Sequence, residues 1–180
     1  MKHYMHIDSP LGRILLASDH RALSGLWFVG QKYEAVPGRD WKEERDSPLF
    51  ARAQTELAEY FAGKRTVFNL PLGPKGTPFQ QHVWRTLGTI PAGTTVTYGA
   101  LAESLGAPRS VRAAAAAIGR NPISIIIPCH RVIGSDGSLT GYAGGLGRKS
   151  ALLVLEAAAA PLLQQPTHGR SALDCSRTAP

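Results

Sequence analysis

The amino-acid sequence predicts an α+β fold, in which a small antiparallel sheet and one helix precede a helical domain with a winged helix-turn-helix. Short apolar runs separated by turn residues fill the first 30 positions, as in a meander of strands. Capped segments with helical periodicity fill the second half. A Pro- and Gly-rich stretch at 69–76 separates the two patterns. We therefore expect an N-terminal α+β domain over 1–76, a C-terminal domain over 77–160 and a disordered tail over 161–180.

The composition is typical of a globular intracellular protein. The chain has 180 residues, 43% of them hydrophobic, and a formal net charge of +7. This charge is compatible with an anionic partner and equally with ordinary solubility. No apolar run approaches the roughly 20 residues of a membrane span, and the N-terminus lacks the apolar core of a signal peptide. Cys129 and Cys175 show no CxxC or clustered Cys/His spacing, so we expect free thiols in a reducing compartment and no structural zinc.

In the N-terminal half, alternating or apolar runs bounded by turns predict three strands, at residues 3–8, 13–18 and 23–30. Residues 31–46 are charged and contain Pro and Gly, which predicts a loop. A helix is expected over 47–64, because Ser47 suits its N-cap and Gly63 its C-terminal cap. Its apolar stripe consists of Leu49, Phe50, Ala53, Leu57, Tyr60 and Phe61.

The second half begins with a predicted run of short helices. Thr77 caps the first, in which apolar residues recur at helical spacing. Thr97 can cap a second helix over 98–106, and Pro108 opens a third that ends near Gly119. Two short helices joined by a few residues resemble a helix-turn-helix. Three further elements are predicted after them: a buried strand at 123–127, a Gly-rich hairpin or wing at 134–147 and a last helix at 148–160.

The third of these helices carries five consecutive alanines, Ala113 to Ala117. Alanine favours helix and has little bulk, so the run suits close helix packing and equally a close approach to a nucleic-acid duplex. Arg112 lies one residue earlier, near the end of a recognition helix that usually makes base contacts. The alternative interpretation of Arg112 is a solvated surface charge.

The most apolar run of the chain leads directly into Pro128, Cys129 and His130. A thiolate is a good nucleophile, and nearby positive or donor groups favour it. Neighbouring side chains of an extended chain point to opposite faces, so His130 needs a turn or a bridging water to reach the sulfur. Glu156, in an otherwise apolar helix, and Asp136 are both candidates to orient the histidine. A buried, inert cysteine and a helix-surface glutamate are the alternatives.

The segment NPISIIIPCHRVIGSDGSLTGYAGG resembles the active-site region of the O6-alkylguanine-DNA alkyltransferases, or methylated-DNA–protein-cysteine methyltransferases. The family signature is a Pro-Cys-His-Arg run after an Asn-Pro and a hydrophobic segment, and it falls here at Asn121–Pro122 and Pro128–Val132. The resemblance covers 77–157 and continues more weakly through the N-terminal half, for which it implies a ribonuclease H-like domain. Ala143, in place of the serine of mammalian members, resembles the bacterial type.

This resemblance implies a role for each residue around the cysteine. Cys129 is expected to be the alkyl acceptor, His130 to activate it through a water, and Glu156 to orient the histidine. Asn121 is expected to tie the recognition helix to the active-site strand. Tyr98 is expected to contact the flipped guanine and to stabilise it as it leaves. The guanine pocket is assigned to Pro128, Tyr142, Ala143 and Gly144.

The resemblance also implies how the chain binds DNA. Arg112 is expected to enter the duplex and fill the space left by the flipped base. The alanine run permits close approach to the minor groove. The further DNA-binding residues expected on this face are Ser110, Ala113 and Arg120.

The implied function is DNA repair by direct reversal of damage. An alkyl group passes irreversibly from O6-alkylguanine to Cys129 after base flipping, so that each chain acts once, and O4-alkylthymine is left open as a second substrate. The implied partner is double-stranded DNA containing alkylated guanine, with no cofactor, no metal and no membrane. We expect a cytoplasmic monomer that associates with the nucleoid on DNA, with cooperative assembly left open.

Two other classes of function compete with this one. An alkyltransferase-like binding protein flags damaged guanine without accepting the alkyl group, but it lacks the cysteine that is present here as Cys129. A winged-helix regulator would need a second DNA-reading domain or a dimer interface. Neither feature is evident in the sequence.

Overall fold

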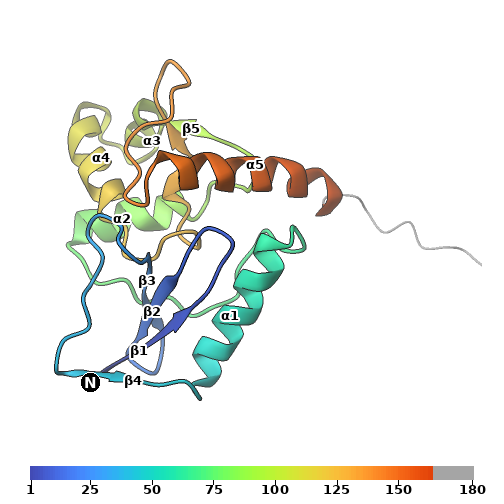
Figure 1. Ribbon diagram of the computed structural model, residues 1–180. Helices are drawn as coiled ribbons and strands as arrows, with labels where there is room; N and C mark the ends of the chain where they lie inside the picture. Colours follow the sequence, from blue (N-terminus) through green and yellow to red (C-terminus); the bar gives the residue numbers. More distant parts are fainter. Residues whose placement is uncertain (164–180) are drawn as a thin grey trace, which may run out of the picture.

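The computed structural model of the chain describes residues 1–163, with the sheet and α1 on one side and α2 to α5 on the other (Figure 1). The main sheet has the strand order β3-β2-β1-β4. Its strands are β1 (Lys2–Ile7), β2 (Ile14–Ser18), β3 (Leu23–Phe28) and β4 (Trp41–Glu43). The first three pair antiparallel, as predicted, and the register places Leu16 between Met5 and Leu26.

Both faces of this sheet are covered, which explains why every residue of β2 is buried. One face shares the main core with α1 (Pro48–Phe61), whose Phe50 and Tyr60 are buried there. On the other face, Trp27 packs in a smaller cluster with Leu15 and Ala17. The strands are therefore apolar on both faces and not simply alternating.

The prediction of a loop over 31–46 is wrong at β4, which pairs parallel with β1 and makes the sheet mixed. The sequence Trp-Lys-Glu of β4 shows no apolar alternation, because only its first residue is half-buried. This short strand is held by backbone pairing along the edge of β1. Local periodicity does not detect such pairing.

The predicted helices of the second half are present: α2 (Pro78–Leu87), α3 (Tyr98–Ser104) and α4 (Val111–Gly119), the last preceded by a 3-10 turn at Pro108–Ser110. Thr77 forms a reciprocal capping box with Gln80, and the Thr97 hydroxyl accepts a hydrogen bond from the Ala100 amide. Trp84 of α2 donates from its indole to the carbonyl of Ala117 at 2.9 Å, which ties α2 to the end of α4.

The last helix, α5 (Leu146–Leu163), begins two residues earlier than predicted and continues into the expected tail. The rest of that tail, 164–180 with Cys175, lies outside the described residues. Within residues 1–163, no helix is both long and apolar enough to cross a membrane.

The Gly-rich segment after the cysteine does not form a hairpin with itself. β6 (Val132–Ile133) pairs parallel with β5 (Val96–Thr97), and residues 134–145 return to α5 as a loop. The segment therefore packs beside α3 through a non-local strand pair. The predicted wing is a loop, and hydrogen bonds to the carbonyls of Thr140 and Ala143 hold its second half.

The buried strand predicted at 123–127 is wrong. The chain makes a compact turn there: Ile125 has a φ of +70°, and the amide of Ile127 donates to the carbonyl of Ile123 at 3.0 Å. Only one bridge to the sheet remains, between Ile123 and Leu26. A short apolar run does not distinguish a strand from a buried turn, because both hide the same side chains. Here the turn brings the start of the Cys129 segment against the edge of β3.

Candidate active site around Cys129

Cys129 opens a single 3-10 turn, η2 (Cys129–Arg131), directly after Pro128. Its side chain is 5% exposed, and its amide donates to the carbonyl of Ile127 at 2.8 Å. The turn replaces the extended backbone that would have sent consecutive side chains to opposite faces. As a result, Cys129 and His130 are both buried on the inner side of the loop.

The side chain of Asn121 holds this loop in shape. Its Nδ2 donates to the carbonyl of Ile127 at 2.7 Å and lies 3.3 Å from that of Ile123. The same nitrogen lies 3.1 Å from the sulfur of Cys129, and Oδ1 accepts from the amide of Ile123 at 3.0 Å. Two amide hydrogens thus serve three acceptors, so one of these bonds is shared. Asn121 supplies the partners that a strand ladder would otherwise provide, and it directs a donor at the thiol.

Glu156, on α5 and 1% exposed, is the centre of a second network. Its Oε1 lies 2.9 Å from Nε2 of His130, 2.7 Å from a terminal nitrogen of Arg131 and 2.8 Å from the hydroxyl of Tyr60. Its Oε2 accepts from Nε of Arg131 at 2.8 Å. Residue reasoning left both Glu156 and Asp136 as partners of His130. The structure brings Glu156 to it, whereas Asp136 is exposed and bonds to Ser138.

The electrostatics of this network determine the tautomer of His130. Burial opposes ionisation of Glu156, but hydrogen bonds from His130 and Arg131 outweigh it and lower the pKa of the carboxyl to about 2. Burial also lowers the pKa of the His130 imidazole, although Glu156 acts in the opposite direction. A neutral imidazole beside an ionised carboxylate donates from Nε2, which leaves a lone pair on Nδ1. Among the described residues, none hydrogen-bonds to that Nδ1, so it is available as a base.

The thiol itself is protonated in this environment at neutral pH. Burial raises the pKa of the Cys129 thiol to about 11, although the Asn121 amide and the Lys149 ammonium act in the opposite direction. Reaction of the sulfur as a nucleophile therefore requires a base to take its proton.

Lys149 is a site residue that sequence reasoning missed. It is fully buried, and its Nζ donates to the carbonyls of Val132 and Thr140 at 2.5 Å each. It precedes Glu156 by seven residues, or two turns of α5, so both point to the same side. A charged pair at this spacing within an apolar helix is the signal that would have found it.

Two tyrosines form a wall near the sulfur. The Tyr98 hydroxyl donates to the carbonyl of Thr140 at 3.2 Å, and burial raises the pKa of this phenol. The Tyr142 ring lies edge-on to that of His130, with 6.5 Å between centroids. Gly141 has a φ of +63°, and a Cβ there would lie 2.5 Å from the Tyr98 oxygen, so a larger residue would displace this tyrosine.

A cavity of about 460 Å³ opens beside this wall. Predicted pocket residues Tyr142 and Ala143 line it, together with Arg120 and Tyr33. Tyr33 comes from the loop after β3, which is joined to the pocket by a hydrogen bond from the Lys32 amide to the Ala143 carbonyl at 3.1 Å. The first half of the chain thus contributes to a cavity that was expected to belong to the second half alone.

The predicted DNA-binding residues occupy the outer face of α4. Arg112, Ala113 and Arg120 are exposed, and Ser110 is half-buried in the 3-10 turn before the helix. The inner face of α4 is buried through Ala114, Ala117 and Ile118. The two interpretations of the alanine run are therefore compatible, because one face packs and the other is free.

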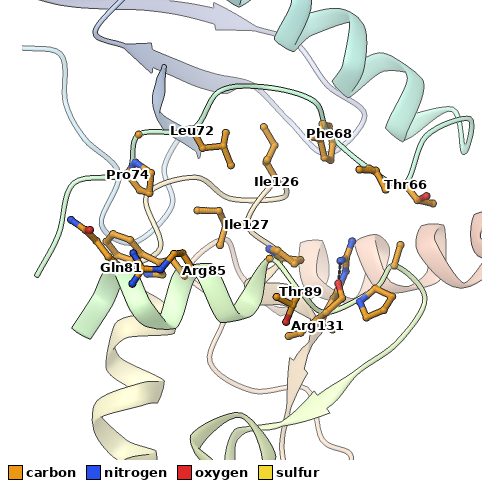
Figure 2. A pocket seen from close by; sticks show the side chains of 18 residues that line it. Thr66, Phe68, Leu72, Pro74, Gln81, Arg85, Thr89, Ile126, Ile127 and Arg131 are labelled. Atoms are coloured by element: carbon orange, nitrogen blue, oxygen red, sulfur yellow. Dashed lines mark hydrogen bonds between the residues drawn. The ribbon is translucent and has the colours of Figure 1, made fainter. Parts of the chain in front are cut away.

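A second cavity, of about 590 Å³, lies behind the cysteine loop (Figure 2). Ile126, Ile127 and Arg131 face it from the loop, opposite α2 and the segment 66–74. Cys129 lines neither this cavity nor the first, and the predicted pocket residue Pro128 lines this one. Its place behind the loop separates it from the wall of Tyr98 and Tyr142.

Comparison with known families covers nearly all of the described chain. Residues 78–158 match the profile of the 6-O-methylguanine DNA methyltransferase, DNA binding domain. Residues 2–74 match the profile of the 6-O-methylguanine DNA methyltransferase, ribonuclease-like domain. Two profiles of one family therefore match the two halves of the chain.

Curated relatives extend this similarity. A methylated-DNA–protein-cysteine methyltransferase of Mycobacterium tuberculosis (strain ATCC 25618 / H37Rv) is 49% identical over 162 residues, which are 89% of this chain and 96% of the relative. One of Methanosarcina barkeri is 51% identical over 155 residues, 86% of this chain and 96% of the relative. The crystal structure of Mycobacterium tuberculosis OGT in complex with DNA is 46% identical with a TM-score of 0.81, over 87% of this chain and 94% of that chain.

The network around Asn121 leads to a prediction about stability. Replacing Asn121 with Ala leaves the amide of Ile123 without its partner and the carbonyl of Ile127 with the Cys129 amide alone. We expect a loss of about 2–4 kcal/mol in the free energy of unfolding, measured by urea denaturation. Asn69→Ala, at an exposed position, is the matched control and should change stability by less than about 0.5 kcal/mol. Equal effects of the two substitutions would show that Asn121 does not hold the loop.

Glu156 leads to a prediction about acid stability. Its pKa is lowered to about 2 in the folded chain. Its contribution is therefore complete above the unfolded value of about 4.3 and is lost as the pH falls through about 2. We expect Glu156→Gln to cost about 3 kcal/mol at neutral pH, and this difference from wild type to shrink below about pH 4.3. Urea denaturation at successive pH values measures it. Glu103→Gln, exposed on α3, is the control, and a difference that stays constant with pH contradicts an ionised Glu156.

Proposed function

Because the chain belongs to the methylated-DNA–protein-cysteine methyltransferase family, we propose that Cys129 accepts an alkyl group from O6-alkylguanine in double-stranded DNA. The observation that carries this proposal is the placement of one buried thiol between two polar networks. Asn121 directs a donor at the sulfur, and Glu156 holds His130 in the tautomer of a base. A merely structural cysteine would need neither network.

The first step of the proposed reaction removes the thiol proton. Neutral His130 takes it at Nδ1, with a water molecule carrying the proton from the sulfur. The imidazolium that forms is stabilised by the ionised carboxylate of Glu156, 2.9 Å from Nε2. The nearby ammonium of Lys149 and the Asn121 amide favour the thiolate that remains.

The second step is an in-line displacement at the alkyl carbon. A carbon–sulfur bond forms, the bond between the alkyl carbon and O6 breaks, and guanine leaves with the electron pair of that bond. Tyr98 retains its proton at neutral pH, because burial raises the pKa of its phenol. It can therefore donate a hydrogen bond as charge develops on the base. Over the whole reaction the thiol loses one proton and the departing base gains one, so guanine leaves neutral and the imidazolium of His130 returns to its neutral form.

The product explains why the protein acts once. S-alkylcysteine is a thioether, and it contains no bond that water hydrolyses under ordinary conditions. The reaction is stoichiometric in protein. O4-alkylthymine presents the same alkyl–oxygen bond, so its transfer is measured in parallel with that of O6-alkylguanine.

Access to the alkyl group requires the base to leave the stack. The target oxygen lies inside the duplex, and extrusion costs a few kcal/mol. We propose that Arg112, exposed at the first turn of α4, fills the space that the base vacates. Exposed Ala113 and Ala116 have little bulk and permit a close approach to the minor groove. Half-buried Ser110 and exposed Arg120, at the two ends of α4, are assigned to DNA backbone contacts.

We propose that the two domains of the chain have different tasks in the reaction. Residues 77–160 carry the reacting groups, and residues 1–76 support them. Tyr60 of α1 donates to Glu156, and the Lys32 amide closes the pocket loop. We propose that the protein acts on DNA as a monomer, because one chain supplies every group that the reaction needs. The proposed location is the cytoplasm.

Methyl transfer to Cys129 is the direct test of this function. Incubation with duplex DNA that contains O6-methylguanine should add one methyl group to the Cys129 peptide, detected by mass spectrometry after digestion. Cys129→Ala should retain DNA binding and lose transfer completely. Cys175→Ala is the matched thiol control and should transfer as wild type does. An unmodified Cys129 on tightly bound DNA would overturn the proposal in favour of a binding protein.

The assignment of Arg112 is tested by comparing two substrates. Arg112→Ala should slow transfer from duplex DNA about 10- to 100-fold, because the extruded base is no longer replaced in the stack. Transfer from the free O6-alkylguanine base should change little, since no stack is involved. Arg45→Ala is the control, because Arg45 is exposed two residues after β4, a strand that lies on the opposite side of the molecule from α4 (Figure 1). If Arg112→Ala slows both substrates equally, Arg112 has no role in extrusion.

A further inference from the structure

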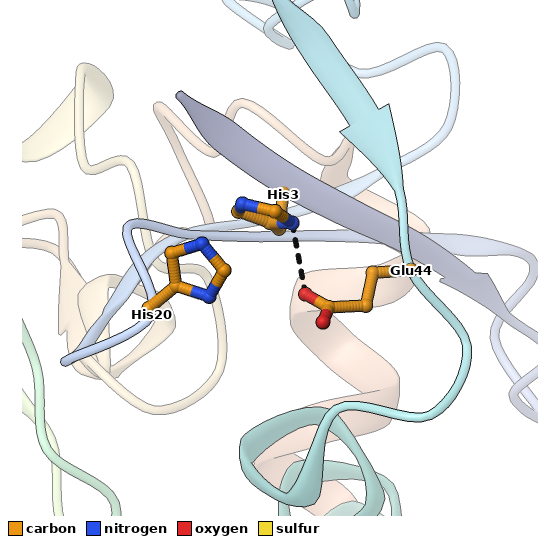
Figure 3. A group of neighbouring side chains, drawn as sticks. All are labelled: His3, His20 and Glu44. Atoms are coloured by element: carbon orange, nitrogen blue, oxygen red, sulfur yellow. Dashed lines mark ion pairs between the residues drawn. The ribbon is translucent and has the colours of Figure 1, made fainter.

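Three potential metal ligands meet at the end of the main sheet that lies away from α3 and α4 (Figures 1 and 3). His3 comes from β1, His20 from the turn between β2 and β3, and Glu44 from the residue after β4. One ligand atom from each lies within 4.8 Å of those of the other two. The group is remote from Cys129, and the proposed alkyl transfer does not use it.

The topology of the sheet assembles this cluster. His3 faces Ser18 across the antiparallel pair of β1 and β2, which places it beside the turn that carries His20. The parallel pairing of β4 sets His3 opposite Lys42, and the amide of Glu44 continues the pairing with a hydrogen bond to Tyr4 at 2.9 Å. Three segments that are distant in sequence are thus fixed side by side by backbone hydrogen bonds.

His3 is the residue that indicates a ligand. Its side chain is only 4% exposed, and neither ring nitrogen has a hydrogen-bond partner among residues 1–163. Its Nδ1 lies 2.9 Å from Oε2 of Glu44, within ion-pair distance but without the alignment of a hydrogen bond. Buried polar atoms are nearly always paired. Nδ1 of His3 and Oε2 of Glu44 are close but not aligned with each other, an arrangement that suits two ligands of one ion.

His20 completes the group from the exposed side. Its φ of +71° is uncommon for a residue with a side chain, and its ring lies against that of His3 with 3.6 Å between centroids. Figure 3 shows both imidazoles and the carboxylate turned toward one space. The backbone is held in an unfavourable conformation that brings a third donor to the other two.

We propose that His3, His20 and Glu44 bind a divalent transition-metal ion, with Zn²⁺ as the best match. Two imidazole nitrogens and one carboxylate oxygen are a zinc donor set, whereas Ca²⁺ and Mg²⁺ prefer oxygen ligands alone. Two ligands of a tetrahedral zinc lie about 3.4 Å apart, given bonds of about 2.1 Å. Nδ1 of His3 and Oε2 of Glu44 are already near that spacing. Rotation of the exposed His20 side chain can bring its ring nitrogen to the same distance from both. Water would take the fourth position.

The expected effect of the ion is structural. It would link β1, the turn after β2 and the short edge strand β4, which otherwise depends on a few backbone hydrogen bonds. The sequence analysis expected no zinc, and the proposed site differs from that expectation. That expectation considered cysteine spacing, and the ligands here are histidines and a glutamate far apart in the chain.

The test measures Zn²⁺ binding by the full, untagged chain after treatment with EDTA. Both cysteines are changed to Ser, so that no thiol competes for the ion. Isothermal titration should show about one equivalent of Zn²⁺ per chain, and saturating Zn²⁺ should raise the melting temperature. His20→Asn and Glu44→Gln should each weaken binding about tenfold or more and abolish most of that rise. His20→Asn is the more informative variant, because His20 is exposed and Asn tolerates a positive φ.

His82→Asn, an exposed histidine on α2, is the matched control and should bind Zn²⁺ as the parent does. Absence of binding by the parent, or equal binding by the parent and His20→Asn, overturns the proposal. The first result would leave His3 and Glu44 as an ion pair only, and the second would place the ion elsewhere. Methyl transfer by His20→Asn with both cysteines intact should equal that of wild type. Failure of the zinc proposal therefore leaves the proposed methyl transfer unaffected, and the reverse also holds.

Discussion

The buried carboxylate of Glu156 is the interaction on which the arrangement of this molecule depends. An ionised group inside an apolar helix is unfavourable unless every lone pair has a partner. The chain supplies them from two places: His130 and Arg131 from the cysteine loop, and Tyr60 from α1. The same bonds that stabilise the charge hold α5, the loop and the N-terminal half together. Orientation of His130 is therefore a consequence of the requirement that Glu156 be satisfied.

Asn121 performs the corresponding task on the other side of the thiol. The cysteine loop is too tightly turned to pair with a sheet, since Ile125 adopts a positive φ and only Ile123 bridges to β3. One amide side chain replaces the missing ladder and is itself buried by the residues it supports. Among the described residues, the sulfur of Cys129 is thus held by one polar contact, from Asn121, and by apolar packing. A loop of this kind is rigid for the same reason that a strand is, because its backbone polar groups are paired.

Sequence reasoning succeeded where the determinants are local and failed where they are not. Thr77 and Thr97 cap helices through bonds to residues three positions away, and they were found. The run at 123–127 was assigned to a strand, because apolarity reports burial and not backbone shape. β4 was missed because its pairing with β1 comes from outside the segment. The acceptor role of Cys129 came from the family resemblance and stays a prediction. Adjacent residues left the partner of His130 open between Glu156 and Asp136, and that choice depended on how α5 packs.

The environment of the thiol suits a protein that reacts once. For the proposed transfer, any reaction of Cys129 with another electrophile or oxidant destroys a molecule of protein. Burial raises the pKa of this thiol to about 11, so the reactive thiolate is scarce at neutral pH. The neutral base His130 sits beside it, its tautomer set by Glu156. Because Cys129 is only 5% exposed, an electrophile must reach a sulfur that the surrounding residues cover. In the proposed reaction, selectivity follows from two requirements: an extruded base must deliver the alkyl group, and His130 must be free to take the thiol proton.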